Sequence, residues 1–131
     1  RGGNYLLNIA PNAQGEWDPI AYQRLEEVGA WMNINGTAIY GTHPVAPYEV
    51  KTEQGTWVFT ENDQAELFAV FIPIDFQVMF VELPLNQLKL SDKKNITTLG
   101  STSRYKLKKS TANVLLYDSE GLPQVWKISK K

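Results

Sequence analysis

Two carboxylates near the start of the chain have the residue types and the spacing for acid–base chemistry. Glu16 and Asp18 follow the first apolar segment, and a pair of carboxylates can supply a general acid and a general base. If that segment is a barrel strand, the pair lies near its carboxyl end, where barrel active sites gather. Asp18 also precedes Pro19 and suits a helix N-cap, because its carboxylate can accept from the free amides of the first turn. We therefore interpret Asp18 as a cap and Glu16 as a solvated loop residue, and we assign no catalytic residue.

Three other residues around the same turn are better candidates for contacts with a ligand: Asn8, Asn12 and Trp17. Asn8 is a polar residue in an otherwise apolar segment, and a buried amide must find hydrogen-bond partners. It either bonds within the fold or lines a pocket, and we favour the first. Trp17 could cover a ligand ring or hold the loop against the following helix, and we favour the second.

The composition excludes several classes of function. The chain has no cysteine, which removes disulfides, thiolate zinc sites and a cysteine nucleophile, and its only histidine is His43. We therefore expect no metal site. The formal net charge of −1 argues against nucleic-acid binding, which needs a basic face. No apolar run approaches the roughly 18 residues that span a membrane, so we expect no membrane partner.

The turn that carries the candidate residues joins a predicted strand to a predicted helix. Residues 4–10 are apolar on both faces, which is typical of a strand in a parallel sheet and requires parallel neighbours. The helix begins at Asp18-Pro19, and Gly36 is placed to end it in the left-handed conformation. Its apolar stripe has the spacing of a helix lying on a sheet: Ala21, Leu25, Val28 and Met32.

A change from helical to alternating periodicity, with Pro44 and Pro47, predicts a domain boundary at residues 42–47. Short strands without helices follow, which indicates an antiparallel sandwich. Most acidic residues fall before position 85 and most lysines after it, so we expect opposite-charge pairs across strands. The predicted strands are residues 56–60, 66–72, 77–83, 87–90, 96–99, 104–108, 112–117 and 124–128.

Four aromatic residues of the predicted sandwich could form a ligand platform: Trp57, Tyr105, Tyr117 and Trp126. Alternating strands bury one face, and aromatic residues favour such positions, so we expect them in the core. Asn35-Gly36-Thr37 and Asn95-Ile96-Thr97 have the form of N-glycosylation sequons. The first of these coincides with the expected end of the helix.

Residues 2–42 carry a specific family resemblance. The stretch GGNYLLNIAP, Gly15, the run VGAW and the closing NGTAIYGT resemble the end of the barrel in the alpha-L-fucosidases of glycoside hydrolase family 29. Two positions depart from that pattern: Ala10 stands where the family has glycine and Gln14 where it has aspartate. Residues 57–60, 67–70 and 96–101 are more weakly similar to the family's C-terminal β-sandwich.

The resemblance implies an α+β multidomain fragment. Residues 1–42 would be the last βα unit of a (β/α) barrel, and residues 43–131 an antiparallel β-sandwich. The chain would then be the C-terminal part of a retaining alpha-L-fucosidase, in which one carboxylate attacks the anomeric carbon and a second acts as acid and then base. Such an enzyme would need no cofactor. Both carboxylates lie upstream in the family, so the chain by itself is expected to be inactive.

The resemblance also implies partners: the remainder of the barrel, on the same or a second chain, and a fucosylated glycan as substrate. The compartment would be periplasmic or extracellular for a bacterial protein, and lysosomal or extracellular for a eukaryotic one. Asn8, Asn12 and Trp17 would lie near the sugar. The alternative is a non-catalytic carbohydrate-binding or structural module.

Overall fold

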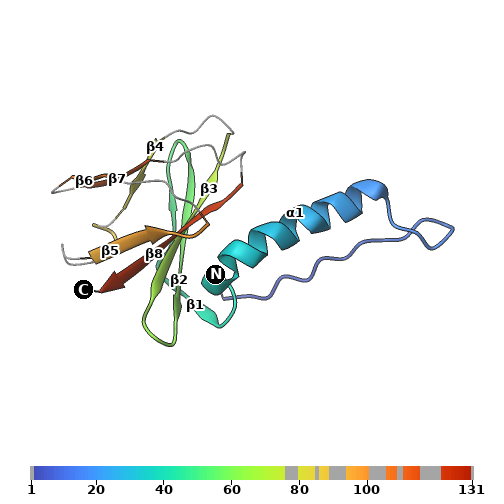
Figure 1. Ribbon diagram of the computed structural model, residues 1–131, viewed down its shortest axis with the longest axis horizontal. Helices are drawn as coiled ribbons and strands as arrows, with labels where there is room; N and C mark the ends of the chain where they lie inside the picture. Colours follow the sequence, from blue (N-terminus) through green and yellow to red (C-terminus); the bar gives the residue numbers. More distant parts are fainter. Residues whose placement is uncertain are drawn as a thin grey trace.

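The computed structural model describes residues 2–75, 80–84, 86–88, 94–100, 106–108, 111–115 and 122–130. This part of the chain contains one α-helix, α1 (Pro19–Asn35), a 3-10 helix, η1 (Gly36–Ala38), and eight strands (Figure 1). The strands are β1 (Thr42–Lys51), β2 (Gly55–Asn62), β3 (Leu67–Pro73), β4 (Phe80–Leu83), β5 (Lys94–Thr98), β6 (Lys106–Lys108), β7 (Thr111–Leu115) and β8 (Gln124–Lys130).

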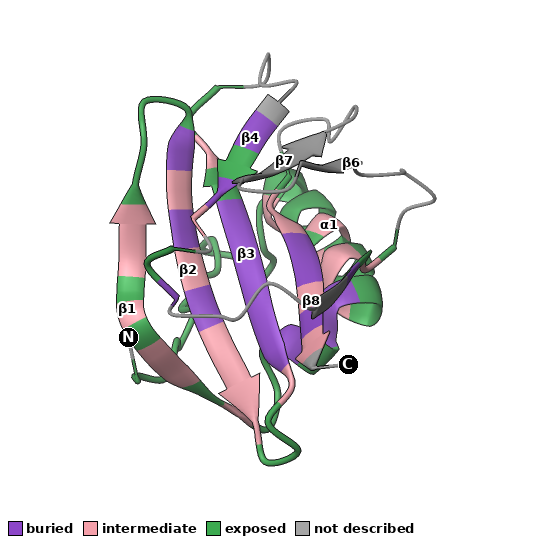
Figure 2. Cartoon of the chain, turned by 90° about the vertical axis from the view of Figure 1, so that its left-hand side faces the viewer, coloured by how far each residue is buried: buried purple, intermediate pink, exposed green. Residues whose placement is uncertain are grey.

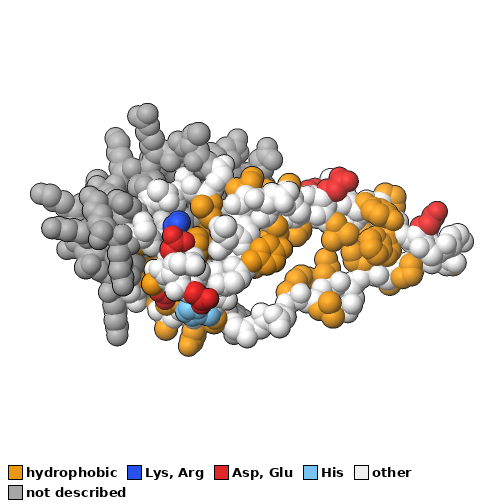
Figure 3. Space-filling model, turned by 60° about the horizontal axis from the view of Figure 1, so that its bottom comes forward, with side chains coloured by type: hydrophobic (Ala, Val, Ile, Leu, Met, Phe, Trp, Pro, Cys, Tyr) orange, Lys and Arg blue, Asp and Glu red, His pale blue; other side chains and the backbone are white. Residues whose placement is uncertain are grey.

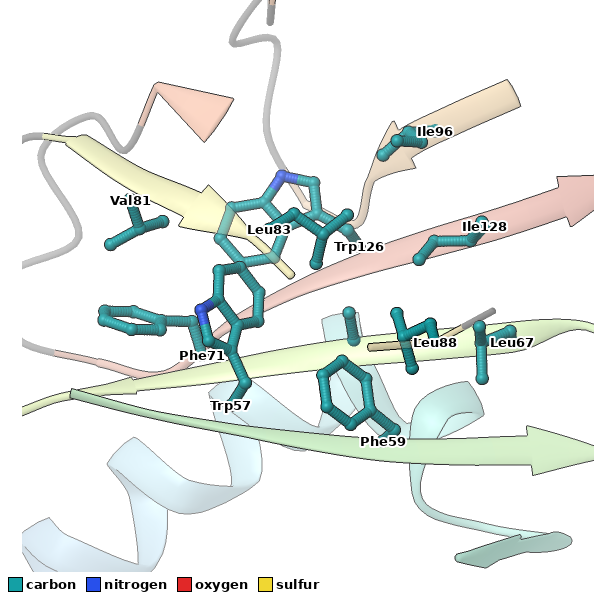
Figure 4. Close-up of a cluster of buried hydrophobic side chains, with 11 residues drawn as sticks. Trp57, Phe59, Leu67, Phe71, Val81, Leu83, Leu88, Ile96, Trp126 and Ile128 are labelled. Atoms are coloured by element: carbon teal, nitrogen blue, oxygen red, sulfur yellow. The ribbon is translucent and has the colours of Figure 1, made fainter. Parts of the chain in front are cut away.

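The strands form two antiparallel sheets that share one core. Five strands follow the order β1-β2-β3-β8-β5, and three follow the order β4-β7-β6. Side chains of both sheets meet in a buried cluster that includes Trp57, Phe71, Trp126, Val81 and Leu83 (Figure 4). The predicted α+β class with an antiparallel sandwich is therefore confirmed.

The central strand β3 is buried on both faces (Figure 2). Ala69 and Phe71 point into the core between the sheets, whereas Phe68 and Val70 pack on the other side with Val125 and Ala38. A strand covered on both sides reads as a continuous apolar run rather than an alternating one, which explains the sequence of residues 67–71. The face of β3 that carries Phe68 and Val70 is covered by η1, which directly follows α1.

The helix α1 begins as predicted and ends differently. Asp18 is the N-cap, with its side chain accepting from the Ile20 amide at 2.8 Å, and Pro19 occupies the first turn. Gly36 has φ −57°, so the predicted left-handed stop is wrong, and η1 continues from this residue. Gly36 instead supplies space, because a Cβ there would lie 3.1 Å from the Tyr40 ring. A left-handed glycine follows η1 a few residues later, at Gly41, with φ +65°.

The strand predicted at residues 4–10 is not formed. This segment has no secondary structure and pairs with none of the described strands. A strand needs a neighbour to satisfy its amides and carbonyls, and the five-stranded sheet ends at β1 and β5 without including this segment. Together with the following turn and most of α1, it forms an arm, residues 2–30, that projects from the sandwich (Figure 1).

Residues 42–47, where the sequence predicts a domain boundary, belong to strand β1. Proline cannot donate to a ladder and is therefore confined to edge strands and bulges. β1 is an edge strand, and its register with β2 shifts between Pro44 and Glu49, so both exceptions apply.

Over the described residues, the remaining strand predictions agree with β2 to β8 except at residues 87–90, whereas residues 77–79, 104–105 and 116–117 of the predicted strands fall outside the described residues. Gln87 and Leu88 lie in a turn, and residues 89 and 90 fall outside the described residues. Among the described residues, no helix is both long and apolar enough to cross a membrane.

Candidate functional site

The turn at the free end of the arm is organised by Asn12. Its Oδ1 accepts from the amides of Gln14 at 3.0 Å and Glu16 at 2.8 Å. Its main chain closes the same turn through bonds to Glu16 and Gly15 at 2.8 and 3.0 Å, and Gly15 has the left-handed φ of +81°. The acceptor of the Asn12 side chain is therefore already used, which favours a structural role for this residue.

Trp17 packs on the first turn of α1. Its ring lies 5.5 Å from the Tyr22 ring, centroid to centroid, at an interplanar angle of 42°. Trp17 directly precedes the N-cap and Tyr22 is the fourth helical residue, so the two form the hydrophobic staple that fixes the entry of a chain into a helix. The predicted attachment of the loop to the helix is confirmed. Trp17 is still 39% exposed, which leaves one face of the indole open.

The two carboxylates beside Trp17 behave as the sequence indicated. Asp18 is engaged as the N-cap, and Glu16 is an exposed turn residue. Asn8 is exposed as well, and no hydrogen bond joins its side chain to another described residue. The fold thus brings Asn12 and Trp17 to the two ends of one turn, whereas Asn8 lies on the segment that leads into it.

Exposed apolar side chains run along both limbs of the arm (Figure 3). Tyr5 and Leu6 are 86% and 81% exposed. The helix adds residues on either side of its predicted stripe, which sequence reasoning missed: Ile20 and Tyr22 are at least half exposed. The sequence does indicate this surface, because these apolar residues lie outside the stripe. A helix that is apolar on more than one side is typical of an element that other parts of a protein enclose. Scattered exposed residues are ordinary, but a contiguous apolar surface marks an interaction site.

The aromatic residues of the sandwich do not form a surface platform. Trp57 and Trp126 are both fully buried, with ring centroids 5.3 Å apart, and Trp57 also packs on Phe71 (Figure 4). The expected core role is confirmed for these two tryptophans. Tyr105 and Tyr117 lie outside the described residues.

One of the expected opposite-charge pairs is present beside β3. Lys127 Nζ lies 2.5 Å from Glu66 Oε1, and Asn62 Nδ2 donates to the other carboxylate oxygen at 2.9 Å. The hydrogen bonds from Lys127 and Asn62 hold the pKa of Glu66 below its ordinary value. His43 is 4.0 Å from Glu61, and no group of three potential metal ligands occurs in the part of the chain that the structure describes.

Comparison with known proteins gives consistent matches. The model of the family described as Alpha-L-fucosidase matches residues 1–37. Tissue alpha-L-fucosidase of Rattus norvegicus is 40% identical over 101 residues, covering 76% of this chain and 20% of that protein. Alpha-L-fucosidase of Branchiostoma floridae is 34% identical over 99 residues, covering 76% of this chain and 21% of that protein. The chain thus spans about one fifth of these relatives.

The fold itself has solved counterparts. A crystal structure of Thermotoga maritima alpha-fucosidase superimposes with a TM-score of 0.68 at 23% identity, covering 97% of this chain and 31% of that one. A structure of the same protein in complex with fucose superimposes with a TM-score of 0.67 over the same share of this chain. At this identity the likeness concerns the fold alone.

Proposed function

Because the chain belongs to the alpha-L-fucosidase family, we propose that it works as the C-terminal part of a retaining alpha-L-fucosidase. The whole protein would hydrolyse terminal alpha-L-fucose from glycans with two carboxylates, one as nucleophile and one as acid and base. We place both carboxylates in the remainder of the barrel, because Asp18 is engaged as a helix cap and Glu16 lies exposed in the turn. The chain by itself is then inactive.

The exposed apolar surface of the arm is the observation that carries this proposal. Burying a side chain of the size of Leu6 or Tyr5 contributes about 2 kcal/mol, so a surface with several of them strongly favours a covering partner. The unpaired segment 2–10 needs strand neighbours for the same reason. The remainder of the barrel supplies both, with residues 4–10 as the last strand and α1 on the outside.

The helix α1 also separates the turn at the free end of the arm from the sandwich. A helix of 17 residues is about 25 Å long, so the turn at residues 12–16 lies far from the sandwich at the other end of α1 (Figure 1). Barrel active sites gather where strands end and turns begin, and the opposite face serves stability. We therefore assign residues 43–131 to bracing the barrel, and residues 1–42 to completing it.

The same geometry assigns roles to the candidate site residues. Asn8 would point into the barrel or line the sugar pocket, and the open face of Trp17 would lie at the rim on the substrate side. Asn12 would shape the turn that carries them, because its side-chain oxygen already accepts two amide bonds.

Complementation with the rest of a barrel tests this proposal. The chain is mixed with the barrel portion of a family relative, and the mixture is followed by native mass spectrometry and by hydrolysis of an aryl alpha-L-fucoside. We expect a one-to-one complex that turns over the substrate, whereas neither part does so alone. A chain that stays monomeric in the mixture would contradict the proposal.

A matched pair of variants shows which surface is used. Leu6→Asp places a charge on the arm and should weaken the complex at least about tenfold, since the lost burial exceeds about 1.4 kcal/mol. Tyr48→Asp makes a comparable change outside the arm, on the edge strand β1, where Tyr48 is 57% exposed. That variant should associate like the parent chain. Equal weakening by both would argue against docking through the arm.

A further inference from the structure

The base of the arm is tied to the sandwich at two separate points. The Thr60 hydroxyl of β2 donates to the carbonyl oxygen of Ala38 in η1 at 2.7 Å, across 22 positions of sequence. The Trp31 indole of α1 donates to the carbonyl oxygen of Pro123, which precedes β8, at 2.6 Å. Because the strand order is β2-β3-β8, the two ties lie on opposite sides of the central strand β3.

The Thr60 bond satisfies a carbonyl group that the helix itself leaves without a partner. The last carbonyls of a helix have no donor within it, and Ala38 ends η1 and is fully buried. The Thr42 hydroxyl lies 3.3 Å from the same oxygen but only 2.9 Å from the carbonyl oxygen of Ile39. A hydroxyl has one hydrogen to donate, so Thr60 is the main donor to Ala38. A buried carbonyl without a donor is costly, and the bond therefore holds this turn against β2.

Two ties on opposite sides of β3 fix a direction, whereas a single tie would leave a pivot. The helix α1 is about 25 Å long and projects from the sandwich, so a rotation of about 10° at its base would move its far end by about 4 Å (Figure 1). Neighbouring strands lie about 4.8 Å apart, so such an error approaches one strand spacing. A segment that is already held in its bound direction loses less freedom when it docks.

We propose that Thr60 is a positioning residue that acts through the carbonyl of Ala38. Together with Trp31 it fixes the direction in which the arm leaves the sandwich. In the proposed fucosidase this direction presents residues 4–10 to the remainder of the barrel, and that consequence alone rests on the proposed function. The sandwich then orients the arm as well as bracing the barrel.

Distances measured on the chain alone test the direction of the arm. The chain has no cysteine, so Gln23→Cys on α1 and Glu53→Cys in the turn between β1 and β2, both at exposed positions, introduce two sites for spin labels. Double electron–electron resonance gives the distribution of the distance between the labels. We expect a single narrow distribution in this labelled parent chain.

Thr60→Val keeps the shape of the side chain and removes the hydroxyl, so it should broaden or shift this distribution. Position 23 lies about 18 Å from the end of α1, so a rotation of about 10° at the base moves the label by about 3 Å. Trp31→Phe removes the other tie and should have a comparable effect.

Two threonine variants are the controls. Thr60→Ser keeps the donor, and Thr56→Val makes the same change on the same face of β2, where no hydrogen bond joins the hydroxyl to another described residue. Both should give the parent distribution. A parent distribution in Thr60→Val, or equal broadening in Thr56→Val, would overturn the proposal.

Association with the barrel portion of a family relative separates this inference from the proposed function. Thr60→Val should weaken the complex about fivefold, the equivalent of one hydrogen bond, whereas Thr56→Val should bind like the parent chain. If the parent chain does not associate, the proposed function fails, and the label distances still decide whether Thr60 sets the direction of the arm. Parent-like affinity of Thr60→Val beside a broadened distribution would overturn the link to docking.

Discussion

The indole Nε1 of Trp31 donates to the carbonyl oxygen of Pro123 at 2.6 Å, across 92 positions of sequence. This bond ties α1 to the chain that enters β8, the strand next to the buried centre of the sheet. Trp31 also packs against the cluster of Ala38, Phe68, Val70 and Val125. The end of α1 is therefore held both by a hydrogen bond and by apolar contact, and it gives the arm a fixed base.

Trp31→Phe removes the hydrogen bond and keeps an aromatic ring. We expect the free energy of unfolding to fall by about 1 kcal/mol, the usual net contribution of such a bond, as measured by urea denaturation followed by circular dichroism. Trp17→Phe is the control, because no hydrogen bond joins the Trp17 indole to another described residue and its ring packing on Tyr22 is retained. It should change stability by less than about 0.5 kcal/mol. If both variants lowered the free energy of unfolding equally, the hydrogen bond from Trp31 to Pro123 would contribute nothing to stability.

Gly100 is predicted to be intolerant of a side chain for two separable reasons. Its φ is +72°, which costs an L-residue about 1 kcal/mol, and an added Cβ would collide with Ile34 of α1. Gly100→Ala should therefore destabilise the chain by about 2 kcal/mol, with displacement of Ile34 adding to the backbone strain. Urea denaturation measures this change.

Gly41→Ala separates the two contributions. Gly41 has a similar φ of +65°, but nothing lies within 4 Å of its added Cβ, so this variant should show the backbone cost alone. Ile34→Ala in the Gly100→Ala background should recover the difference, because it removes the colliding side chain. If Gly41→Ala and Gly100→Ala were equally destabilising, the contact with Ile34 would not constrain position 100.

The ion pair beside β3 predicts an acid-dependent part of the stability. The hydrogen bond from Lys127 keeps the pKa of Glu66 below its ordinary value of 4.5. A carboxylate with a depressed pKa stabilises the fold above its unfolded pKa, and that contribution is lost as the pH falls through the folded value. Glu66→Gln should therefore be less stable than the parent chain at pH 7, and the difference should shrink below pH 4.5.

The control for this pH dependence is another carboxylate of the sandwich. Glu53 lies exposed in the turn between β1 and β2, and no ion pair joins it to another described residue. Glu53→Gln removes the same charge without removing a partner, so the melting temperature should follow that of the parent chain between pH 7 and pH 3. A Glu66→Gln curve parallel to that of the parent would exclude a contribution from the Lys127 pair.

The sequence was most informative where local chemistry determines structure. Asp18-Pro19 specifies a helix start by capping and a fixed φ, and both are observed. The alternating periodicity located most of the strands, and the preference of aromatic residues for the buried face of a strand predicted the burial of Trp57 and Trp126. The turn at Asn12 and the staple between Trp17 and Tyr22 also depend only on neighbours close in sequence. The proximity of Asn8, Asn12 and Trp17 to a sugar stays a prediction.

Features that depend on distant neighbours were not predicted. Pro44 and Pro47 argue against a strand unless it lies at an edge, and the sequence does not say which strand is outermost. Gly36 was predicted to adopt a left-handed conformation, but it is needed because the Tyr40 ring folds back against it. The segment 2–10 has the composition of a strand, yet a strand requires partners, and the described sheets provide none.

Two substitutions of Asp18 test whether its carboxylate has a structural or a catalytic role. Its Oδ1 accepts from the Ile20 amide at 2.8 Å, and asparagine caps a helix about as well as aspartate does. Asp18→Asn should therefore keep the stability of the chain and, in the complex that we propose with the remainder of a barrel, the turnover of an aryl alpha-L-fucoside. Asp18→Ala should lower the free energy of unfolding by about 1 kcal/mol, because one amide of the first turn loses its acceptor. A loss of turnover in Asp18→Asn at unchanged stability would instead identify Asp18 as a catalytic group, since the neutral amide keeps the cap but cannot act as a base.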